Sequence, residues 1–109
     1  MNFEEYQKEV NKHAVYPIVG KKFVYPVLGL VGEAGEVAEK IKKILRDNDG
    51  NVSEEQKNEI KKELGDVLWY LSQLAIDLEI SLDDVASCNI EKIKSRRERG
   101  VVKGIGDNR

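Results

Sequence analysis

Apolar residues recur at helical spacing through most of the chain. From Val27 to Leu45 they fall three or four positions apart without a break, which is the pattern of a helix with one buried face. Pro26 suits the first turn of such a helix, because proline has no backbone N–H to donate there. The sequence DNDG at 47–50 is typical of a turn. We therefore predict a long helix that begins at Pro26 and ends near Arg46.

A second long helix is predicted to begin after Ser53. The Ser53 hydroxyl can accept a hydrogen bond from the backbone N–H of Gln56, while the Gln56 side chain reaches back to Ser53. This reciprocal pair is the capping box of a helix N-terminus. The apolar stripe of the helix then runs from Ile60 to Leu78.

A further helix is predicted from Ser81 toward Arg99. Asp84 stands three positions after Ser81, as the acidic counterpart of the glutamine in a capping box. Gly100 is expected to end this helix, and the glycine-rich tail, residues 101–109, is expected to be a loop.

The N-terminal quarter predicts one short helix and one irregular connection. Phe3, Tyr6 and Val10 lie at helical spacing, whereas the stretch from Tyr16 to Pro26 has no regular period. No linker or repeat divides the chain. We therefore expect one all-α domain over residues 1–109, with four main helices arranged like a four-helix bundle.

Two pairs of acidic residues stand three positions apart on the two long helices: Glu33 with Glu36, and Glu63 with Asp66. At about 100° per residue, the first pair lies about 90° and 150° to one side of its apolar stripe, and the second about 80° and 140° to the same side. A short turn makes the helices antiparallel. Flanks of the same hand then meet on one common face.

The two pairs are also predicted to lie at the same height. Glu36 and Glu33 precede the expected helix end at Arg46 by 10 and 13 residues, and Glu63 and Asp66 follow the next helix cap by 10 and 13. Four carboxylates placed together repel one another unless a cation neutralises them, and hard ions with oxygen ligands suit them. We predict a Mg²⁺ site, with Mn²⁺ as the alternative ion.

The acids have two other interpretations. In a chain with 35% charged residues, acids three apart also arise by chance, as a solvated helix flank. A di-iron centre would need Glu-x-x-His motifs, and the single histidine, His13, is remote in sequence from both pairs. An oxygen-only site is therefore preferred to redox iron.

The last helix carries Asn89, Lys92 and Arg96, which are candidates for binding phosphate. Taken singly, Asn89 is typical of a buried amide within an apolar stripe, and the two cations are typical of a helix C-terminus. Together they offer an amide, a point charge and a planar guanidinium, which suits a polyphosphate.

Trp69 lies nearly opposite the main stripe of its helix, with Ile76 and Ile80 on the same second face. Packing against the N-terminal helix, a subunit interface and stacking on a nucleobase all fit this pattern. We favour a subunit interface, because a chain of 109 residues gains core by pairing.

Composition limits the classes of partner. The chain has 18 Lys and Arg against 20 Asp and Glu, a balance that gives no general attraction to a nucleic-acid polymer or an anionic membrane. Cys88 is the single cysteine, which excludes an internal disulfide. With neither a signal peptide nor a membrane-spanning run, we expect a soluble cytoplasmic protein.

Two segments resemble a known family. GLVGEAGEVAEKIKK followed by KKELGDVLWYL is similar to the paired Glu-x-x-Glu and Glu-x-x-Asp signature of MazG-like nucleotide pyrophosphohydrolases. NIEKIKSRRERG also resembles the Asn-x-x-Lys segment of that family, so the similarity runs from about Tyr25 to the C-terminus.

The resemblance implies hydrolysis of a nucleoside triphosphate between its α and β phosphates, giving a monophosphate and pyrophosphate. It implies that Glu33, Glu36, Glu63 and Asp66 form the catalytic metal site, that Asn89, Lys92 and Arg96 hold the polyphosphate, and that the protein is a homodimer or homotetramer. Either Glu33 or Glu36 could orient the attacking water. The alternative is a non-catalytic helical interaction or regulatory module whose acids are merely solvated.

Overall fold

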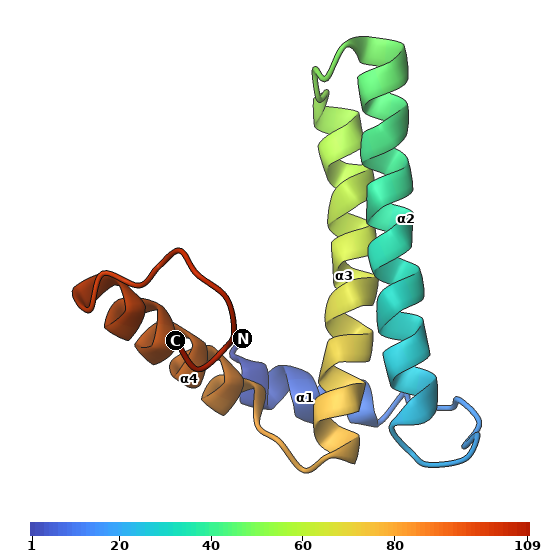
Figure 1. Cartoon of the computed structure of the whole chain (residues 1–109). Coiled ribbons are helices and arrows are strands. Elements are labelled where there is room, and N and C mark those ends of the chain that lie inside the picture. Colours follow the sequence, from blue (N-terminus) through green and yellow to red (C-terminus); the bar gives the residue numbers. More distant parts are fainter.

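The computed structural model describes residues 1–109 and is built from helices alone (Figure 1). In chain order these are α1 (Phe3–Asn11), α2 (Val24–Asn48), α3 (Glu54–Asp77) and α4 (Leu82–Glu98). The predicted all-α class with four helices is therefore confirmed. None of the helices combines the length and the apolar character that a membrane crossing requires.

The predicted cap of α3 is confirmed. The backbone N–H of Gln56 donates to the Ser53 hydroxyl over 3.1 Å, and the Ser53 N–H donates to the Gln56 side chain over 2.9 Å. The Ser81 hydroxyl caps α4 by accepting from the N–H of Asp84 over 3.4 Å, but the Asp84 side chain does not accept from the N–H of Ser81, so the predicted reciprocal pair is only half formed. These local hydrogen bonds satisfy N–H groups that have no partner inside the helix.

The start of α2 differs from the prediction by one half-turn. The helix begins at Val24, so Pro26 occupies its third position and is buried. Proline is tolerated there because the N–H groups of the first turn have no intrahelical acceptor. The helix is therefore longer than its apolar stripe indicates.

α2 and α3 form a long antiparallel hairpin joined by a tight turn (Figure 1). Asp49 and Gly50 adopt positive φ angles of 54° and 81°, which reverse the chain directly after α2. The short connection makes the helices antiparallel, as the sequence predicts. The hairpin is the part of the fold that positions the acidic residues.

α4 points away from the hairpin and is joined to its base through α1 (Figure 1). Gln7 of α1 makes this junction: its side-chain amide donates to the carbonyl of Ile80 and accepts from the N–H of Leu82. Within one chain, the four helices therefore make a hairpin with an arm and do not close into a bundle.

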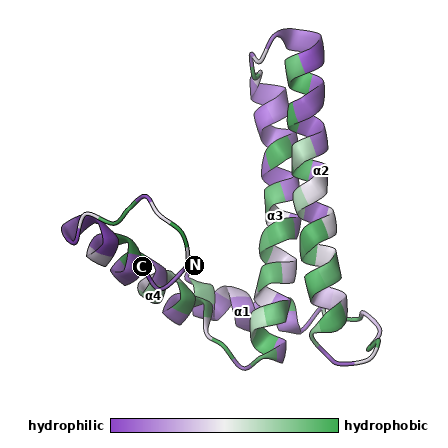
Figure 2. Cartoon of the chain, viewed as in Figure 1, coloured by the Kyte–Doolittle hydropathy of each residue, from purple (hydrophilic) through white to green (hydrophobic).

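A single chain buries little of its apolar surface. The apolar core consists of Val10, Ile44, Ala75 and Leu82. Val31 and Leu64, which belong to the predicted apolar stripes, keep 69% and 52% of their surface exposed. Figure 2 shows apolar residues along much of α3 and the lower part of α2. The two stripes thus extend beyond what the chain itself covers.

Trp69 packs inside the chain, among the aromatic rings of the hairpin base. Its ring meets Tyr16 edge-on at 5.8 Å between centroids and Tyr70 edge-on at 5.0 Å, and Tyr16 stacks on Tyr25 at 5.3 Å. Of the three interpretations of Trp69, the structure shows packing within the chain. The ring that Trp69 meets outside the hairpin is Tyr16, in the loop after α1. An additional subunit contact at this face stays a prediction.

Candidate metal centre

Three of the four predicted carboxylates meet on one face of the hairpin. Glu33 of α2 and Glu63 and Asp66 of α3 each offer an oxygen, and the three oxygens lie within 4.8 Å of one another. Glu33 and Glu63 are half-buried and Asp66 is exposed. The antiparallel geometry and the equal distances from the turn bring these residues to the same height.

Glu36 lies beside this group without joining it. Its side chain is exposed, and its oxygens are not among the three that converge. Its charge nevertheless acts on Glu33, one helical turn earlier. The structure therefore separates one carboxylate of the predicted four from the other three.

The electrostatics of the group reflect crowded negative charge. Partial burial raises the pKa of Glu33 above its ordinary value, and the carboxylates of Asp66, Glu63 and Glu36 raise it further. The pKa of Tyr70 is raised as well, first by burial, then by Tyr25 and by the charge of Glu33. A bound cation would relieve the repulsion among the three carboxylates, so a site of this kind favours cation binding.

Gly29 allows α3 to approach α2 one turn before Glu33. A Cβ atom at Gly29 would collide with the ring of Tyr70, so the Tyr70 side chain occupies the space that a larger residue would need. The close approach brings the two acidic flanks within reach of the same ion.

Lys40 is a member of the site that the sequence reasoning missed. Its ammonium lies 3.7 Å from a Glu63 oxygen and 4.0 Å from a Glu59 oxygen. Lys40 follows Glu33 by seven residues, which places it on the same flank of α2. This spacing could have identified Lys40 in the sequence, because a lysine on the same flank of α2 as Glu33 must face the acids of α3.

The donor set fits a hard divalent cation. All three converging ligands are carboxylate oxygens, which Mg²⁺ and Mn²⁺ accept. His13 pairs with Glu9 on α1, and Cys88 is exposed on α4, so neither belongs to the group. The residues that could hold a metal are thus Glu33, Glu63 and Asp66.

The structure does not bring the predicted phosphate-binding residues to this group within one chain. Asn89, Lys92 and Arg96 lie on α4, which is directed away from the hairpin (Figure 1). Asn89 is exposed, at the rim of a mainly apolar hollow that also includes Phe3 and Leu71. Lys92 and Arg96 instead bind Asp107 of the C-terminal tail.

Comparison with known proteins identifies the family of the chain. The chain is 46% identical over 114 aligned positions to the Gene 37 protein of Mycobacterium phage L5, and the alignment covers the whole of both chains. No solved structure shows significant similarity to it. Residues 26–101, which contain both acidic pairs and the whole of α4, match the family model of the MazG nucleotide pyrophosphohydrolase domain. The chain therefore belongs to the MazG nucleotide pyrophosphohydrolase family.

Proposed function

We propose that this protein is a Mg²⁺-dependent pyrophosphohydrolase that converts a nucleoside triphosphate to a monophosphate and pyrophosphate. The observation that carries the proposal is the meeting of Glu33, Glu63 and Asp66 within 4.8 Å, from two helices of a chain in this family. A solvated acidic flank would not require carboxylates from both helices to converge.

The four acids have separate tasks in this proposal. Glu33, Glu63 and Asp66 hold the ion, because their oxygens converge. A bound Mg²⁺ would draw charge from the phosphate oxygens and so stabilise the transition state. Glu36, exposed beside the group, orients the water that attacks the α phosphorus and accepts its proton.

Lys92 and Arg96 bind the polyphosphate, with Asn89 on the same helix. Their positive charge would stabilise the negative charge that grows on the leaving pyrophosphate. Because α4 points away from its own hairpin, we assign this task to α4 of a second copy, in a homodimer or a homotetramer. The uncovered apolar stripes of α2 and α3 support such an assembly. We place the enzyme in the cytoplasm, where nucleotides are abundant.

The test is release of pyrophosphate from a panel of common ribo- and deoxyribonucleoside triphosphates with Mg²⁺. Monophosphate and pyrophosphate are the expected products, and Asp66→Asn and Glu63→Gln should abolish their formation. Glu55→Gln, which removes an exposed acid of α3 outside the group, serves as the control and should leave the rate unchanged. Diphosphate and orthophosphate as products would contradict the proposal, as would turnover that survives EDTA.

A further inference from the structure

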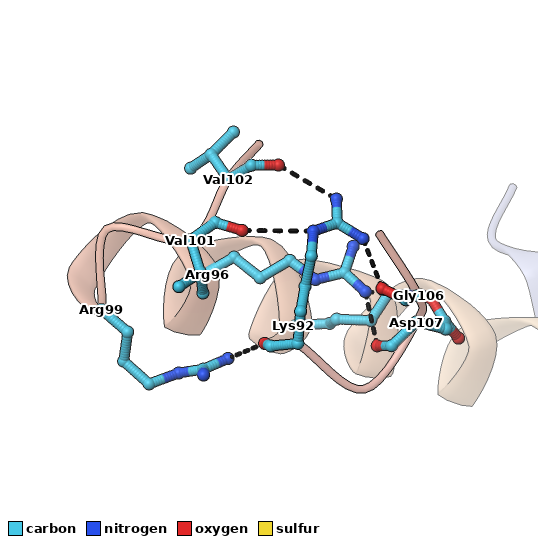
Figure 3. A network of polar contacts seen from close by, with 8 residues as sticks. Lys92, Arg96, Arg99, Val101, Val102, Gly106 and Asp107 are labelled. Carbon is cyan, nitrogen blue, oxygen red and sulfur yellow. Dashed lines mark hydrogen bonds and ion pairs between the residues drawn. The ribbon is translucent and has the colours of Figure 1, made fainter. Parts of the chain in front are cut away.

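The C-terminal tail folds back on α4 and places one carboxylate between two cations (Figure 3). The Lys92 ammonium lies 2.9 Å from Oδ1 of Asp107, and Nη2 of Arg96 lies 3.0 Å from the same oxygen. Asp107 is the only acidic residue after Glu98. The two residues assigned to the polyphosphate are thus both bound to a carboxylate of their own chain.

Arginines of the tail region hold this loop closed. Arg109 donates hydrogen bonds to the carbonyls of Val101, Val102 and Gly106, and Arg99 donates to the main-chain oxygen of Arg109 (Figure 3). The loop therefore has a defined shape that presents Asp107 to α4. The apolar side chain of Ile105 does not contribute to this shape, since it is 97% exposed.

The site is better matched to a larger anion than to one carboxylate. Two positive charges share a single oxygen, and Nε of Arg96 is buried without a hydrogen-bond partner. The Arg96 side chain is 12% exposed, whereas that of Asp107 is 78% exposed. A phosphate group carries more negative charge and more acceptor oxygens than a carboxylate, and arginine binds it through two N–H groups at once.

We propose that the C-terminal tail is a removable cover on a phosphate-binding site formed by Lys92 and Arg96, with Asp107 competing against the phosphate groups of the ligand. The assignment of the ligand as the polyphosphate of a nucleotide rests on the proposed function. The competition itself rests on the three contacting residues alone. The tail must leave α4 before these two cations bind substrate, so it lowers the affinity of the resting protein.

The experiment is calorimetric titration with inorganic pyrophosphate, without divalent ions, of the full chain and of Asp107→Asn. Removal of the competing charge should tighten binding by roughly three- to tenfold, the range expected for two partly exposed ion pairs. Glu91→Gln, which removes an exposed acid on the same helix that makes no ion pair, is the matched control and should change affinity less than twofold. Lys92→Ala and Arg96→Ala should weaken binding in the Asp107→Asn background.

Equal affinity in wild type and Asp107→Asn, or weaker binding in Asp107→Asn, would overturn the proposal. Tightening that persists in the Lys92→Ala and Arg96→Ala backgrounds would overturn it too, because the anion would then bind elsewhere. Circular dichroism of each variant identifies any loss of helix. The titration needs no catalysis, so a protein that releases no pyrophosphate from nucleotides can still pass it, and an active enzyme can still fail it.

Discussion

Lys40 of α2 and Glu63 of α3 reach across the hairpin and bring an ammonium and a carboxylate to 3.7 Å. The lysine is about one-third exposed and also lies 4.0 Å from Glu59. It stands at the border of the three converging carboxylates and offsets part of their charge. A metal ion at Glu63 would therefore compete with Lys40 for the same carboxylate.

Lys40→Met should strengthen binding of Mg²⁺ or Mn²⁺. The substitution keeps most of the length of the side chain but removes the competing charge, and a partly exposed pair of this kind is worth up to about fivefold in affinity. Titration calorimetry with Mn²⁺ measures the change. Lys43→Met, which removes a lysine that pairs with Glu39 outside the site, is the control. Weaker metal binding in Lys40→Met would show that the lysine supports the site.

Divalent metal should raise the thermal stability of the protein by mass action. An ion that binds only the folded state adds about 2.7 kcal/mol at a concentration one hundredfold above its Kd. The increase in Tm with Mg²⁺ should disappear in Glu63→Gln and Asp66→Asn and persist in Glu55→Gln. An unchanged Tm of the wild type with millimolar Mg²⁺ and with Mn²⁺ would argue against the site.

Glu33 should make the metal-free protein less stable as pH rises. Its folded pKa lies above the ordinary value of 4.5, so the folded state binds the proton more tightly than the unfolded state does. The contribution of Glu33 to the stability of the folded state is fully present below pH 4.5. It is lost as the pH rises through the pKa that Glu33 has in the folded state. In EDTA at neutral pH, Glu33→Gln should therefore have a higher Tm than wild type.

The comparison must be made between these two proteins at each pH. Glu9, Glu39, Asp47 and Asp107 have lowered pKa values, so their contributions change with the opposite sign. They are common to both proteins and cancel in the difference. A gain in Tm that is the same at pH 4 and pH 7 would show that charge on Glu33 is not its cause.

Gly29→Ala should destabilise the hairpin. The added methyl group would collide with the Tyr70 ring, and forcing extra volume into a packed site costs roughly 1 to 3 kcal/mol. Gly32→Ala is the matched control on α2, because a Cβ there meets no neighbouring atom. It should stabilise the helix by about 0.5 to 1 kcal/mol. Urea denaturation of both variants measures the difference, and equal effects would contradict the close approach of Tyr70.

The hairpin and its acids follow from local rules, which is why they were predictable. The capping box at Ser53 needs only residues three apart, and the short turn after α2 allows only an antiparallel partner. Once these are fixed, helical geometry alone brings Glu33 to the height of Asp66. The longer start of α2 was missed because the residues before Pro26 carry no apolar period.

The arrangement of the other parts depends on contacts between residues far apart in the sequence. The direction of α4 is set by Gln7, more than 70 residues earlier, and Trp69 is covered by Tyr16 from an irregular loop. The pairing of Asp107 with Lys92 and Arg96 depends on the path of a tail without any periodic pattern. Helical spacing within one element carries no information about such partners.

The junction at Gln7 has a mechanical consequence for the distance between the two charged regions of the chain. One amide side chain holds Ile80 of the connection between α3 and α4, and Leu82 at the start of α4, through two hydrogen bonds, and Leu82 is the one buried residue of α4. α4 is therefore held near its start, where it also meets α1, and not along its whole length. A rotation of about 30° there would move Lys92 and Arg96, which lie about 15 and 21 Å along the helix from Leu82, by roughly 8 to 11 Å while the hairpin keeps its internal packing. The distance that the basic residues can move is thus set by the junction at Gln7, whereas the positions of the acidic residues are set by the packing of the hairpin.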